Sequence, residues 1–500
     1  MAATPELRDS GCVRETNDCG AAGILSCFGE MGGAGGILIN LARVPLKCAG
    51  LANWQILLSE SQERCGYAII PRKWRQAQAI FAKYGLEATV IGVFTGNGQL
   101  QVVYDPELTE FSAATGLSGE VCVDVPYGWF DECPLPRLEV IEPPAKSEGV
   151  AFPGIGLGNV AAMAERVVGQ FDVCNQAPAT TQYDSTVQGR TFWGPLYGRR
   201  YNVPSPLAVL RPVYGKDWGL TVSWSFSPWQ FEVDPVQAAV NALLDAGVTQ
   251  VIAGVRLEDV CLADNFYTPS KDRYAYWYLV EQVRALAGLS IEFGTPFITG
   301  KDSSSGSAVF GQRVINVPPS VCITAMGKIR YARRLKPPKW QAAGNLVFAV
   351  GPQASRLDGS ILSAALGITG SRLESNPVLQ TKSYMGMMAR LGRSALVRSA
   401  VPVNQGGIIR RLFEGVEASG FGFKSEICAE LFPESFGTAL VEVRPEDGAR
   451  LETEFRLLGP MLVGKITRAR GLTVQGQRLP WSRLFRAWNT KFAKEVYDEN

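Results

Sequence analysis

The spacing of apolar and polar residues predicts a chain that mixes helices with strands along its whole length. Short apolar runs bounded by turn-forming residues favour strands, at residues 37–46, 65–71, 207–214, 219–226, 251–263, 320–329, 345–351, 438–444 and 459–467. Apolar residues at helical spacing favour helices, at 72–86, 160–171, 235–245, 276–294, 373–391 and 406–420. The pattern therefore indicates α/β and α+β domains.

Glycines and turn residues place the ends of several of these elements. Gly85 is expected to end the helix at 72–86, and Gly247 to close the helix at 235–245. Two β-rich runs flank Thr95-Gly96-Asn97-Gly98. Because Asn-Gly favours the tight turns that join antiparallel strands, this stretch predicts a β-hairpin.

Changes of pattern along the chain predict five segments. An α+β domain covers 1–125, and a connection rich in Pro and Gly covers 126–180 with one helix near 160–171. An α/β domain follows at 181–335. A second α+β domain occupies 336–485, and residues 486–500 form a tail.

Composition narrows the classes of function. The formal net charge is +2, so no strong overall field favours nucleic acid or a membrane surface, and no apolar run predicts a membrane span. The first residues, MAATPELRDSG, do not resemble a signal peptide. Eleven cysteines without paired spacing favour reduced thiols in a reducing compartment, cytoplasmic or inside an organelle, and core packing explains most of them.

The chain has no histidine. Histidine is the usual general base near neutral pH and a common metal ligand. Its absence excludes Ser-His-Asp hydrolases and histidine-based zinc sites. Any catalytic chemistry would have to use carboxylates, lysine, cysteine or a metal-bound water.

Six motifs, in order, resemble the phosphoribosylformylglycinamidine (FGAM) synthase family, the ATP-dependent amidine-forming ligases of purine synthesis. The segment 17–31 resembles that family's Asp-x-Gly-Ala-Gly-Gly stretch. Leu57–Arg64, LLSESQER, is similar to its Ser-Glu-Ser-Gln-Glu-Arg signature. The others are YDSTVQG at 183–189, LADNF at 262–266, TPFITGKDS at 295–303 and NQGGIIRRLFEG at 404–415.

The resemblance implies an architecture of FGAM synthase and aminoimidazole ribonucleotide synthetase-like domains. Residues 1–125 resemble the C-terminal-type domain of the family's first half, shortened. Residues 181–335 and 336–485 resemble the N-terminal-type and C-terminal-type domains of its second half. The N-terminal-type domain of the first half, which in the family holds much of the site for catalytic ATP and substrate, is not matched.

The second-half nucleotide site implied by the resemblance has lost charge. Asp184 and Asn241 stand at positions that bind metal in the family, but Gln237 stands where the family has Glu. In residues 401–407, VPVNQGG, Pro402 and Gln405 replace two aspartates. Ser185 likewise replaces a histidine. Because Mg²⁺ affinity depends strongly on anionic oxygen ligands, we expect this metal site to be weak. ATP or ADP with Mg²⁺, the nucleotide without metal, and no nucleotide remain the open alternatives.

The resemblance also implies substrate or metal residues in the first half, namely Asp18, Glu60, Glu63 and Arg64, with Gln55 in place of a usual Glu. Alternatively, SESQER is a turn with a structural Glu–Arg pair.

Lys301 and Asp302 follow an apolar run and precede a Gly/Ser-rich turn, so they could approach a nucleotide phosphate. The alternative is a structural loop with a local ion pair.

Three functions remain open. The first is a non-catalytic structural or interaction subunit of a larger assembly. The second is a subunit of a split ATP-dependent FGAM synthase, and the third is a nucleotide-binding regulatory protein. In the family, paired N-terminal-type domains cover each other's sheets. We therefore expect a protein partner or a second copy to cover the sheet of 181–335, and we expect neither a nucleic acid partner nor a membrane span.

Overall fold

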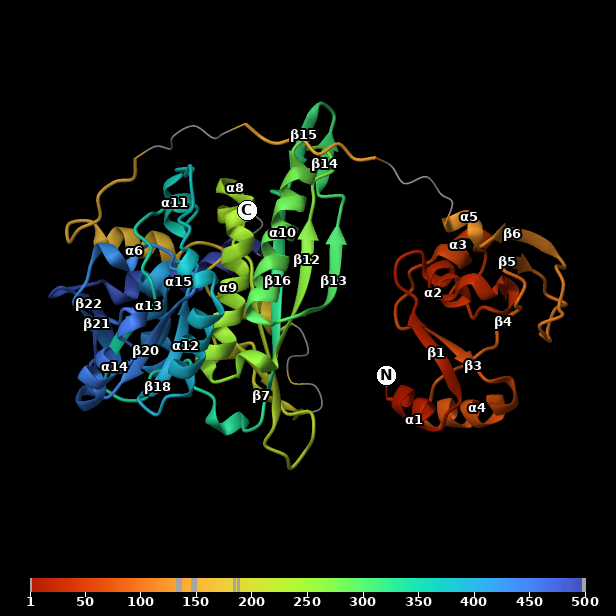
Figure 1. The fold of residues 1–500 in the computed structure, drawn as a ribbon, viewed down its shortest axis with the longest axis horizontal. Coiled ribbons are helices and arrows are strands. Elements are labelled where there is room, and N and C mark those ends of the chain that lie inside the picture. Colours follow the sequence, from red (N-terminus) through yellow and green to blue (C-terminus); the bar gives the residue numbers. More distant parts are fainter. Residues whose placement is uncertain (1, 132–136, 145–150, 183–185, 187–188, 497–500) are drawn as a thin grey trace. The chain divides into compact units, whose positions relative to one another are not determined.

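The structure is a computed structural model that describes residues 2–131, 137–144, 151–182, 186 and 189–496. The chain folds into two compact units, Met1–Arg137 and Leu138–Asn500 (Figure 1).

The first unit has two small sheets and several short helices. Its helices are α1 (Ala3–Asp9), α2 (Gly23–Gly32), α3 (Asn53–Leu58), α4 (Trp74–Lys83) and α5 (Gly128–Asp131). Its strands are β1 (Val13–Asp18), β2 (Ile37–Asn40), β3 (Cys65–Ile69), β4 (Gly92–Phe94), β5 (Gln99–Tyr104) and β6 (Glu120–Pro126). β1 pairs with β3, and a four-stranded sheet has the order β4-β2-β5-β6. Ile37 and Ile39 of β2 pack against Ile24 of α2 in the core.

The hairpin predicted at residues 95–98 is wrong. β4 and β5 are not neighbours, because β2 lies between them, antiparallel to β4 and parallel to β5. The 95–98 turn instead crosses the start of β2, where Thr95 N–H donates to the Gly36 carbonyl at 3.1 Å and Gly98 N–H to that of Gly35 at 3.4 Å. Gly36 has φ +87°, and a Cβ there would lie 2.7 Å from the nitrogen of Gly98. Glycine is therefore what lets the turn approach this closely.

The second unit begins with an α/β domain built on a six-stranded sheet of order β13-β12-β16-β11-β10-β7. The strands are β7 (Thr191–Trp193), β10 (Ala208–Leu210), β11 (Gly219–Ser225), β12 (Val260–Tyr267), β13 (Phe297–Ser303) and β16 (Ser320–Ile329). Three helices accompany it, α8 (Pro228–Val233), α9 (Pro235–Ala253) and α10 (Ala275–Phe293). Two short ladders, β8 (Leu196–Tyr197) with β9 (Val203–Pro204) and β14 (Ser307–Phe310) with β15 (Arg313–Asn316), complete it.

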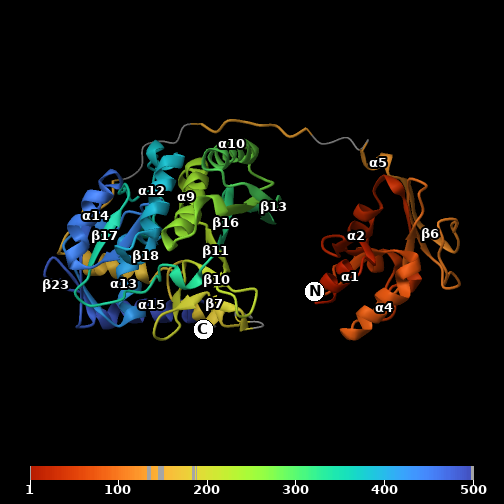
Figure 2. The same ribbon diagram turned by 60° about the horizontal axis from the view of Figure 1, so that its bottom comes forward.

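Within the described residues, helices of this unit cover one face of the six-stranded sheet. α9 and α10 pack on the face to which Thr221, Ser223 and Ser225 of β11 point (Figure 2). On the opposite face, Leu220 and Trp224 are exposed, and Trp224 keeps 63% of its accessible surface. This open face is the part of the domain for which a covering partner is expected.

The helix predicted at 235–245 continues to Ala253, so Gly247 does not close it. Its end is Gly254, at φ +113°, and strand β12 starts only at Val260, not at 251. Gly247 lies against α12 (Lys382–Arg393), because a Cβ there would stand 3.1 Å from the Met385 side chain. By length and composition α9 could cross a membrane, but 89% of its apolar window is buried inside the protein, as in a core helix.

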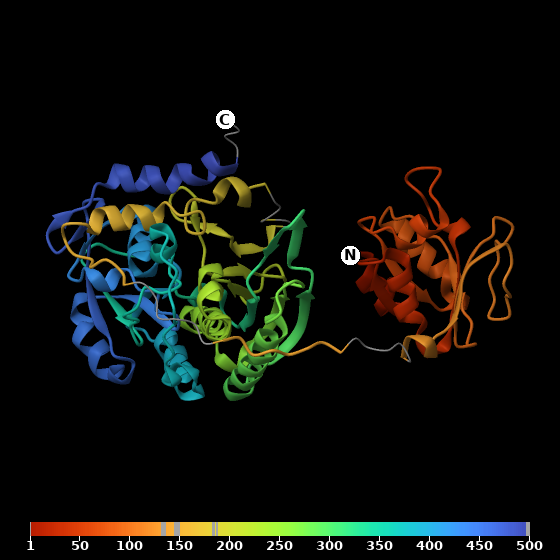
Figure 3. The same ribbon diagram turned by 90° about the horizontal axis from the view of Figure 1, so that it is seen from above.

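The last domain is a seven-stranded sheet of order β18-β20-β17-β21-β19-β22-β23 with helices on both faces (Figure 3). Its strands are β17 (Leu346–Val350), β18 (Val397–Val403), β19 (Gly422–Ser425), β20 (Thr438–Val443), β21 (Met461–Thr467), β22 (Gly471–Val474) and β23 (Gln477–Arg478). Its helices are α6 (Val160–Val168), α7 (Ala177–Thr180), α11 (Ile361–Leu366), α12 (Lys382–Arg393), α13 (Gly407–Ser419), α14 (Gly448–Glu454) and α15 (Trp481–Val496). Along β17, Val347 belongs to the core with α13, and Phe348 to the core with α9 and α12.

Parts of the expected linker and tail are packed elements of this domain. Val160 and Val167 of α6, in the 126–180 connection, are fully buried. Trp488 and Phe492 of α15 are buried in the same core, although the sequence pattern predicts a tail at 486–500. Apolar residues at helical spacing in both segments provide the stripe that buries them. The helix predicted at 373–391 starts only at Lys382, and the other predicted elements are confirmed with shifted boundaries.

Candidate functional site

A cavity of about 70 Å³ lies where the start of α9 meets the loops around the seven-stranded sheet. Gln230, Gln237 and Asn241 form its wall on the α8–α9 side, and residues 352–358, 373–379 and 434–436 supply the other walls. Pockets for drug-sized ligands usually measure about 300–1,000 Å³. The space enclosed in this cavity lies below that range.

Three amide side chains on the α9 side of the cavity bind one another. α9 starts after Asp234, whose carboxylate accepts the N–H of Gln237 at 3.0 Å. The i,i+4 spacing puts Gln237 and Asn241 on one face of the helix, as predicted. Gln237 Nε2 donates to Asn241 Oδ1 at 3.0 Å, and Asn241 Nδ2 donates to Gln230 Oε1 at 2.8 Å. The side-chain oxygen of Asn241 thus accepts an N–H of Gln237.

Glu434, which borders the cavity, is a buried carboxyl held by two backbone amides. Its Oε1 accepts the N–H of Ile361 at 2.8 Å and that of Gly406 at 2.7 Å. Burial raises the pKa of Glu434 to about 7, although the two N–H donors and the nearby Arg410 favour the charged form. Glu434 is therefore an ionisable group that titrates near neutral pH beside the cavity.

Behind the cavity, a buried polar cluster joins α9 to α13. Asn404 Nδ2 donates to both carboxylate oxygens of Asp245, at 3.0 and 3.2 Å. Arg411 donates to Asn404 Oδ1 and to Glu414 Oε2, both at 2.6 Å. Burial raises the pKa of Asp245. Burial would also raise the pKa of Glu414, but Arg410 and Arg411 hold it below its usual value.

Three residues of the segment 401–407 take part in this cluster through hydrogen bonds with Arg410 and Arg411. Asn404 and the carbonyl of Pro402 both accept N–H groups of Arg411, and the carbonyl of Gln405 accepts one of Arg410. The Gln405 side chain does not border the cavity. These positions therefore stabilise the junction of α9 with α13 and offer no anionic ligand to it.

The remaining carboxylates of the cavity wall are also engaged. Asp358 pairs with Arg356 at 3.0 Å and accepts the N–H of Ser371 at 2.7 Å. Glu374 accepts the N–H of Ser355 at 3.0 Å. Within the described residues, no group of three or more Cys, Asp or Glu side chains could hold a metal ion. The donor set present here does not fit the Mg²⁺ ion that the family resemblance implies.

The other predicted nucleotide residues do not join the cavity. Asp184 and Ser185 lie outside the described residues. Lys301 and Asp302 do not line the cavity but lie in the edge strand β13, with exposed side chains. Lys301 Nζ donates to the Asp302 carbonyl at 2.7 Å, and the Asp302 carboxylate accepts the Ser304 hydroxyl at 2.6 Å, which lowers the Asp302 pKa. The expected local ion pair is thus replaced by contacts with the backbone and a hydroxyl.

In the first unit, the residues predicted around SESQER form a turn beside α2. Glu60 Oε1 accepts the N–H of Ala22 at 3.3 Å, directly before α2. Arg64 donates to the carbonyls of Ser59 and Ser61, so the alternative of a Glu–Arg pair is wrong, although the turn itself is confirmed. Glu63 has φ +67°. Asp18, Glu60 and Glu63 are exposed.

The two units repeat one arrangement of strand, glycine turn, helix and glutamate. β1 leads into α2 and pairs antiparallel with β3, as β18 leads into α13 and pairs antiparallel with β20. Ala22 (φ +60°) and Gly406 (φ +78°) precede the two helices in the left-handed conformation. Their N–H groups donate to Glu60 and to Glu434. Glu434 is therefore the second-unit counterpart of Glu60.

Sequence reasoning missed Glu434. A signal was present, because Pro433-Glu434-Ser435 matches Ser59-Glu60-Ser61 in two of three positions, just before a strand. In the buried cluster, the contact of Asn404 with Asp245 gave no such signal because it joins distant segments, whereas Arg411 and Glu414 are three residues apart on one helix.

Comparisons with known proteins agree with this arrangement. The sequence profile described as AIR synthase related protein, C-terminal domain, matches residues 2–105. The phosphoribosylformylglycinamidine synthase subunit PurL of Pyrococcus furiosus is 27% identical over 479 residues, which are 93% of this chain and 62% of that protein. PurL of Limosilactobacillus reuteri is 28% identical over 92% of this chain and 59% of the relative. The chain thus spans about 60% of the length of these relatives.

Among solved structures, PurL of Thermotoga maritima complexed with ATP superposes with a TM-score of 0.63 and 19% identity, over 93% of this chain and 66% of that one. PurLQS of the same organism superposes with a TM-score of 0.60 and 18% identity, over 93% and 66%. The predicted fold class, FGAM synthase and AIR synthase-like domains of mixed α/β type, is confirmed.

Proposed function

We propose that this chain, a divergent member of the phosphoribosylformylglycinamidine synthase family, is a non-catalytic subunit that supplies structure and binding surface to a larger assembly. Its relatives are FGAM synthase subunits of purine biosynthesis, and the proposal places this chain in that setting without a working Mg–nucleotide site of its own. The cysteines of the described residues are all free thiols, which supports a reducing compartment.

The observation that carries the proposal is the all-amide network of Gln230, Gln237 and Asn241. Each of its two hydrogen bonds joins one amide to another, at 2.8 and 3.0 Å, and none of the three side chains is a carboxylate. Mg²⁺ requires near-octahedral oxygen ligands and carboxylates to displace its water. The small volume of the cavity also disfavours the regulatory alternative with a retained nucleotide.

The open face of the six-stranded sheet supports the interaction role. Leu220 and Trp224 of β11 are exposed on it, together with Leu210 of β10. Neighbouring exposed apolar side chains on a sheet mark a surface that another protein covers. The structural neighbour PurLQS is itself an assembly by its name.

A ligand-binding experiment tests the proposal. We expect ATP and ADP, each with and without Mg²⁺, to leave the melting temperature of this protein unchanged, and isothermal titration to show no heat of binding. Thermotoga maritima PurL, solved with both nucleotides, is the positive control. Mg²⁺-dependent stabilisation of this protein by either nucleotide would refute the proposal.

A second function is favoured by the preserved first-unit motif. Glu60 still holds the turn before α2, and Arg64 holds the SESQER turn. This arrangement suits a subunit of a split FGAM synthase, completed by the N-terminal-type domain that the resemblance implies. Steady ATP- and ammonia-dependent formation of FGAM when such a domain is added, lost in Glu60→Gln, would establish it over the first proposal.

A further inference from the structure

Seven basic side chains gather at one end of four neighbouring strands of the six-stranded sheet. Strand pairing puts these ends side by side, because Thr191 of β7 pairs with Leu210, Leu210 with Leu220, and Leu220 with Lys328. These strand ends lie at the bottom of the sheet as drawn in Figure 1. The group, here called the basic strip, consists of Arg190, Arg211, Lys216, Lys328, Arg330, Arg333 and Arg334.

Aromatic rings alternate with these cations. Arg190 lies over the Tyr214 ring at 5.1 Å from its centroid, and Arg211 lies over Phe192 at 5.1 Å. Three further contacts pair Lys328 with Trp218 at 5.7 Å, and Arg330 and Arg334 with Tyr331 at 5.3 and 4.6 Å. Stacking on rings orients the cations while most of them stay in water.

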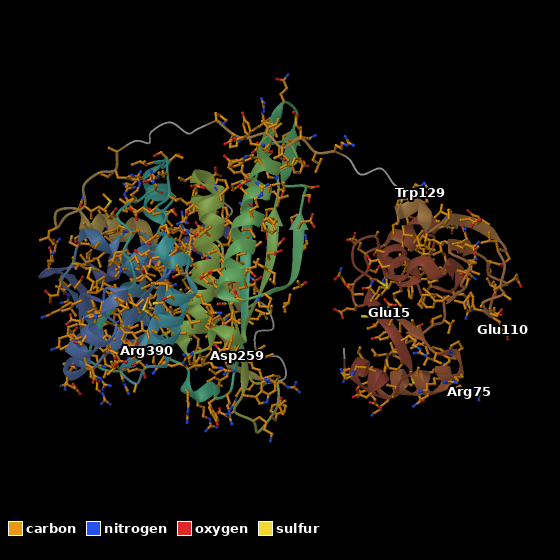
Figure 4. All side chains as sticks on the ribbon, in the orientation of Figure 1. Glu15, Arg75, Glu110, Trp129, Asp259 and Arg390 are labelled. Carbon is orange, nitrogen blue, oxygen red and sulfur yellow. The ribbon has the colours of Figure 1, made fainter. Side chains whose placement is uncertain are left out.

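The strip has little negative charge to balance it. Asp217 is the one acidic residue in the segments 189–193, 208–218 and 326–334. It lies 3.6 Å from Arg333, whose side chain is still 75% exposed. Arg190 Nε is buried and has no hydrogen-bond partner in the structure. Asp259, at the start of the neighbouring strand β12 (Figure 4), is already paired with Arg256 at 2.6 Å.

We propose that the basic strip binds single-stranded nucleic acid. Cations along a strip bind backbone phosphates, and aromatic rings and guanidinium planes between them stack on bases. Four strands at about 4.8 Å spacing make the strip about 14 Å wide, which suits a few nucleotides of one strand. The overall charge of +2 gave no hint of this surface, because a local excess of cations is cancelled elsewhere in the chain.

Other anionic partners fit less well. A DNA duplex is usually read by a helix or a two-stranded ribbon that enters a groove, and this strip is the end of a sheet. A membrane would be bound through a continuous apolar face that inserts, whereas here each of the four rings lies beside a cation. An acidic protein segment would use the charges and leave the rings without a role.

The test is fluorescence anisotropy of a labelled 20-nucleotide single-stranded RNA with the full chain, at several salt concentrations. We expect binding that weakens with salt, as for phosphate contacts. The variant Lys216→Gln/Arg330→Gln/Arg334→Gln should lower affinity at least tenfold and reduce the log–log salt slope by about 2, since each lost phosphate contact of a single strand contributes about 0.7. Tyr331→Leu should lower affinity severalfold and leave the slope unchanged.

The matched control, Lys424→Gln/Lys465→Gln/Arg468→Gln, removes three exposed cations from the last domain and should bind as the wild type does. No binding of the wild type below about 100 μM at low salt would overturn the proposal. So would equal losses in the two triple variants. A duplex, polyglutamate or vesicles with anionic lipids are the competing partners. If one of them binds more tightly than the single strand, and the strip triple variant loses that binding, the strip is assigned to that partner and the proposal is overturned.

Discussion

The carboxylate of Glu434 accepts the backbone N–H of Gly406 at 2.7 Å, just as Glu60 accepts that of Ala22 at 3.3 Å. Both contacts fix the turn before a helix that is preceded by a strand. In the second unit the glutamate is buried beside the cavity, whereas in the first unit it is exposed. The same local arrangement therefore places the glutamate in a buried environment in one unit and at the surface in the other.

Glu434 should make the stability of the second unit depend on pH. Its folded pKa, about 7, lies above the ordinary value of 4.5, so the folded protein holds a proton that the unfolded chain releases. Stability should fall between about pH 4.5 and 7, by at most about 1.4 kcal/mol per pH unit, and stay level above that. In Glu434→Gln, whose side-chain oxygen can still accept both N–H groups, urea unfolding should lose this dependence. Glu446→Gln, an exposed carboxyl, is the control, and an unchanged profile in Glu434→Gln would contradict the assignment.

Removing Asn241 should destabilise the protein without any added ligand. Asn241→Ala leaves Gln237 Nε2 and Gln230 Oε1 without their partners at a largely buried site. Unpaired buried polar groups cost about 1–3 kcal/mol, so we expect a loss of about 2 kcal/mol in denaturant unfolding. The exposed residue Glu452 on α14, replaced by Ala, should change stability by less than about 0.5 kcal/mol. A neutral effect of Asn241→Ala would show that the amide network does not stabilise this junction.

Replacing Arg411 should reduce the stability of the fold more than replacing most other charged residues. Its side chain is 4% exposed and bonds Glu414, Asn404 and the Pro402 carbonyl. Arg411→Met leaves the buried Glu414 with less positive charge, and breaking such a pair costs about 3–5 kcal/mol. Arg450→Met, in a surface pair with Glu454, should cost less than about 1 kcal/mol. Chemical denaturation of both variants measures the contrast, and equal losses would rule out a structural role for the buried cluster.

Gly407 should not tolerate a side chain. Its φ is +64°, and a Cβ would lie 2.8 Å from the carbonyls of Leu431, Phe432 and Pro433. Gly407→Ala is expected to cost more than about 2 kcal/mol and to lower the melting temperature by several degrees. A Cβ at Gly386 in α12 would meet no atom within 4 Å, so Gly386→Ala should be neutral or stabilise by up to about 1 kcal/mol. A neutral Gly407→Ala would mean that this turn can rearrange.

The open sheet face should mediate association. Analytical ultracentrifugation of the full chain is expected to show a dimer or higher species, and Trp224→Glu should shift it toward monomer because a charge replaces an exposed apolar contact. Leu457→Glu, at a position 76% exposed on another part of the unit, is the control. A wild type that stays monomeric at high concentration, and that captures no partner through this face, would contradict the expectation.

The sequence by itself determined the mixed fold and most elements, because the apolar stripe of a helix and the apolar runs of strands are local patterns. It also shows that Gln237, Pro402 and Gln405 carry no negative charge, which is a matter of residue identity. Local patterns also led to one wrong prediction, the hairpin at residues 95–98. The Asn97-Gly98 turn looked like a hairpin, but only the insertion of β2 between β4 and β5 shows that it is a crossing.

Tertiary structure alone decided which polar groups of different elements meet. Gln230 binds Asn241 across two helices, Asn404 binds Asp245 over more than 150 residues of sequence, and Glu434 receives two amides from separate segments. No periodicity encodes such contacts, because they depend on how packed elements lie in space. The basic strip is the same case, since its residues lie at or next to the ends of four strands that become neighbours only when the sheet forms.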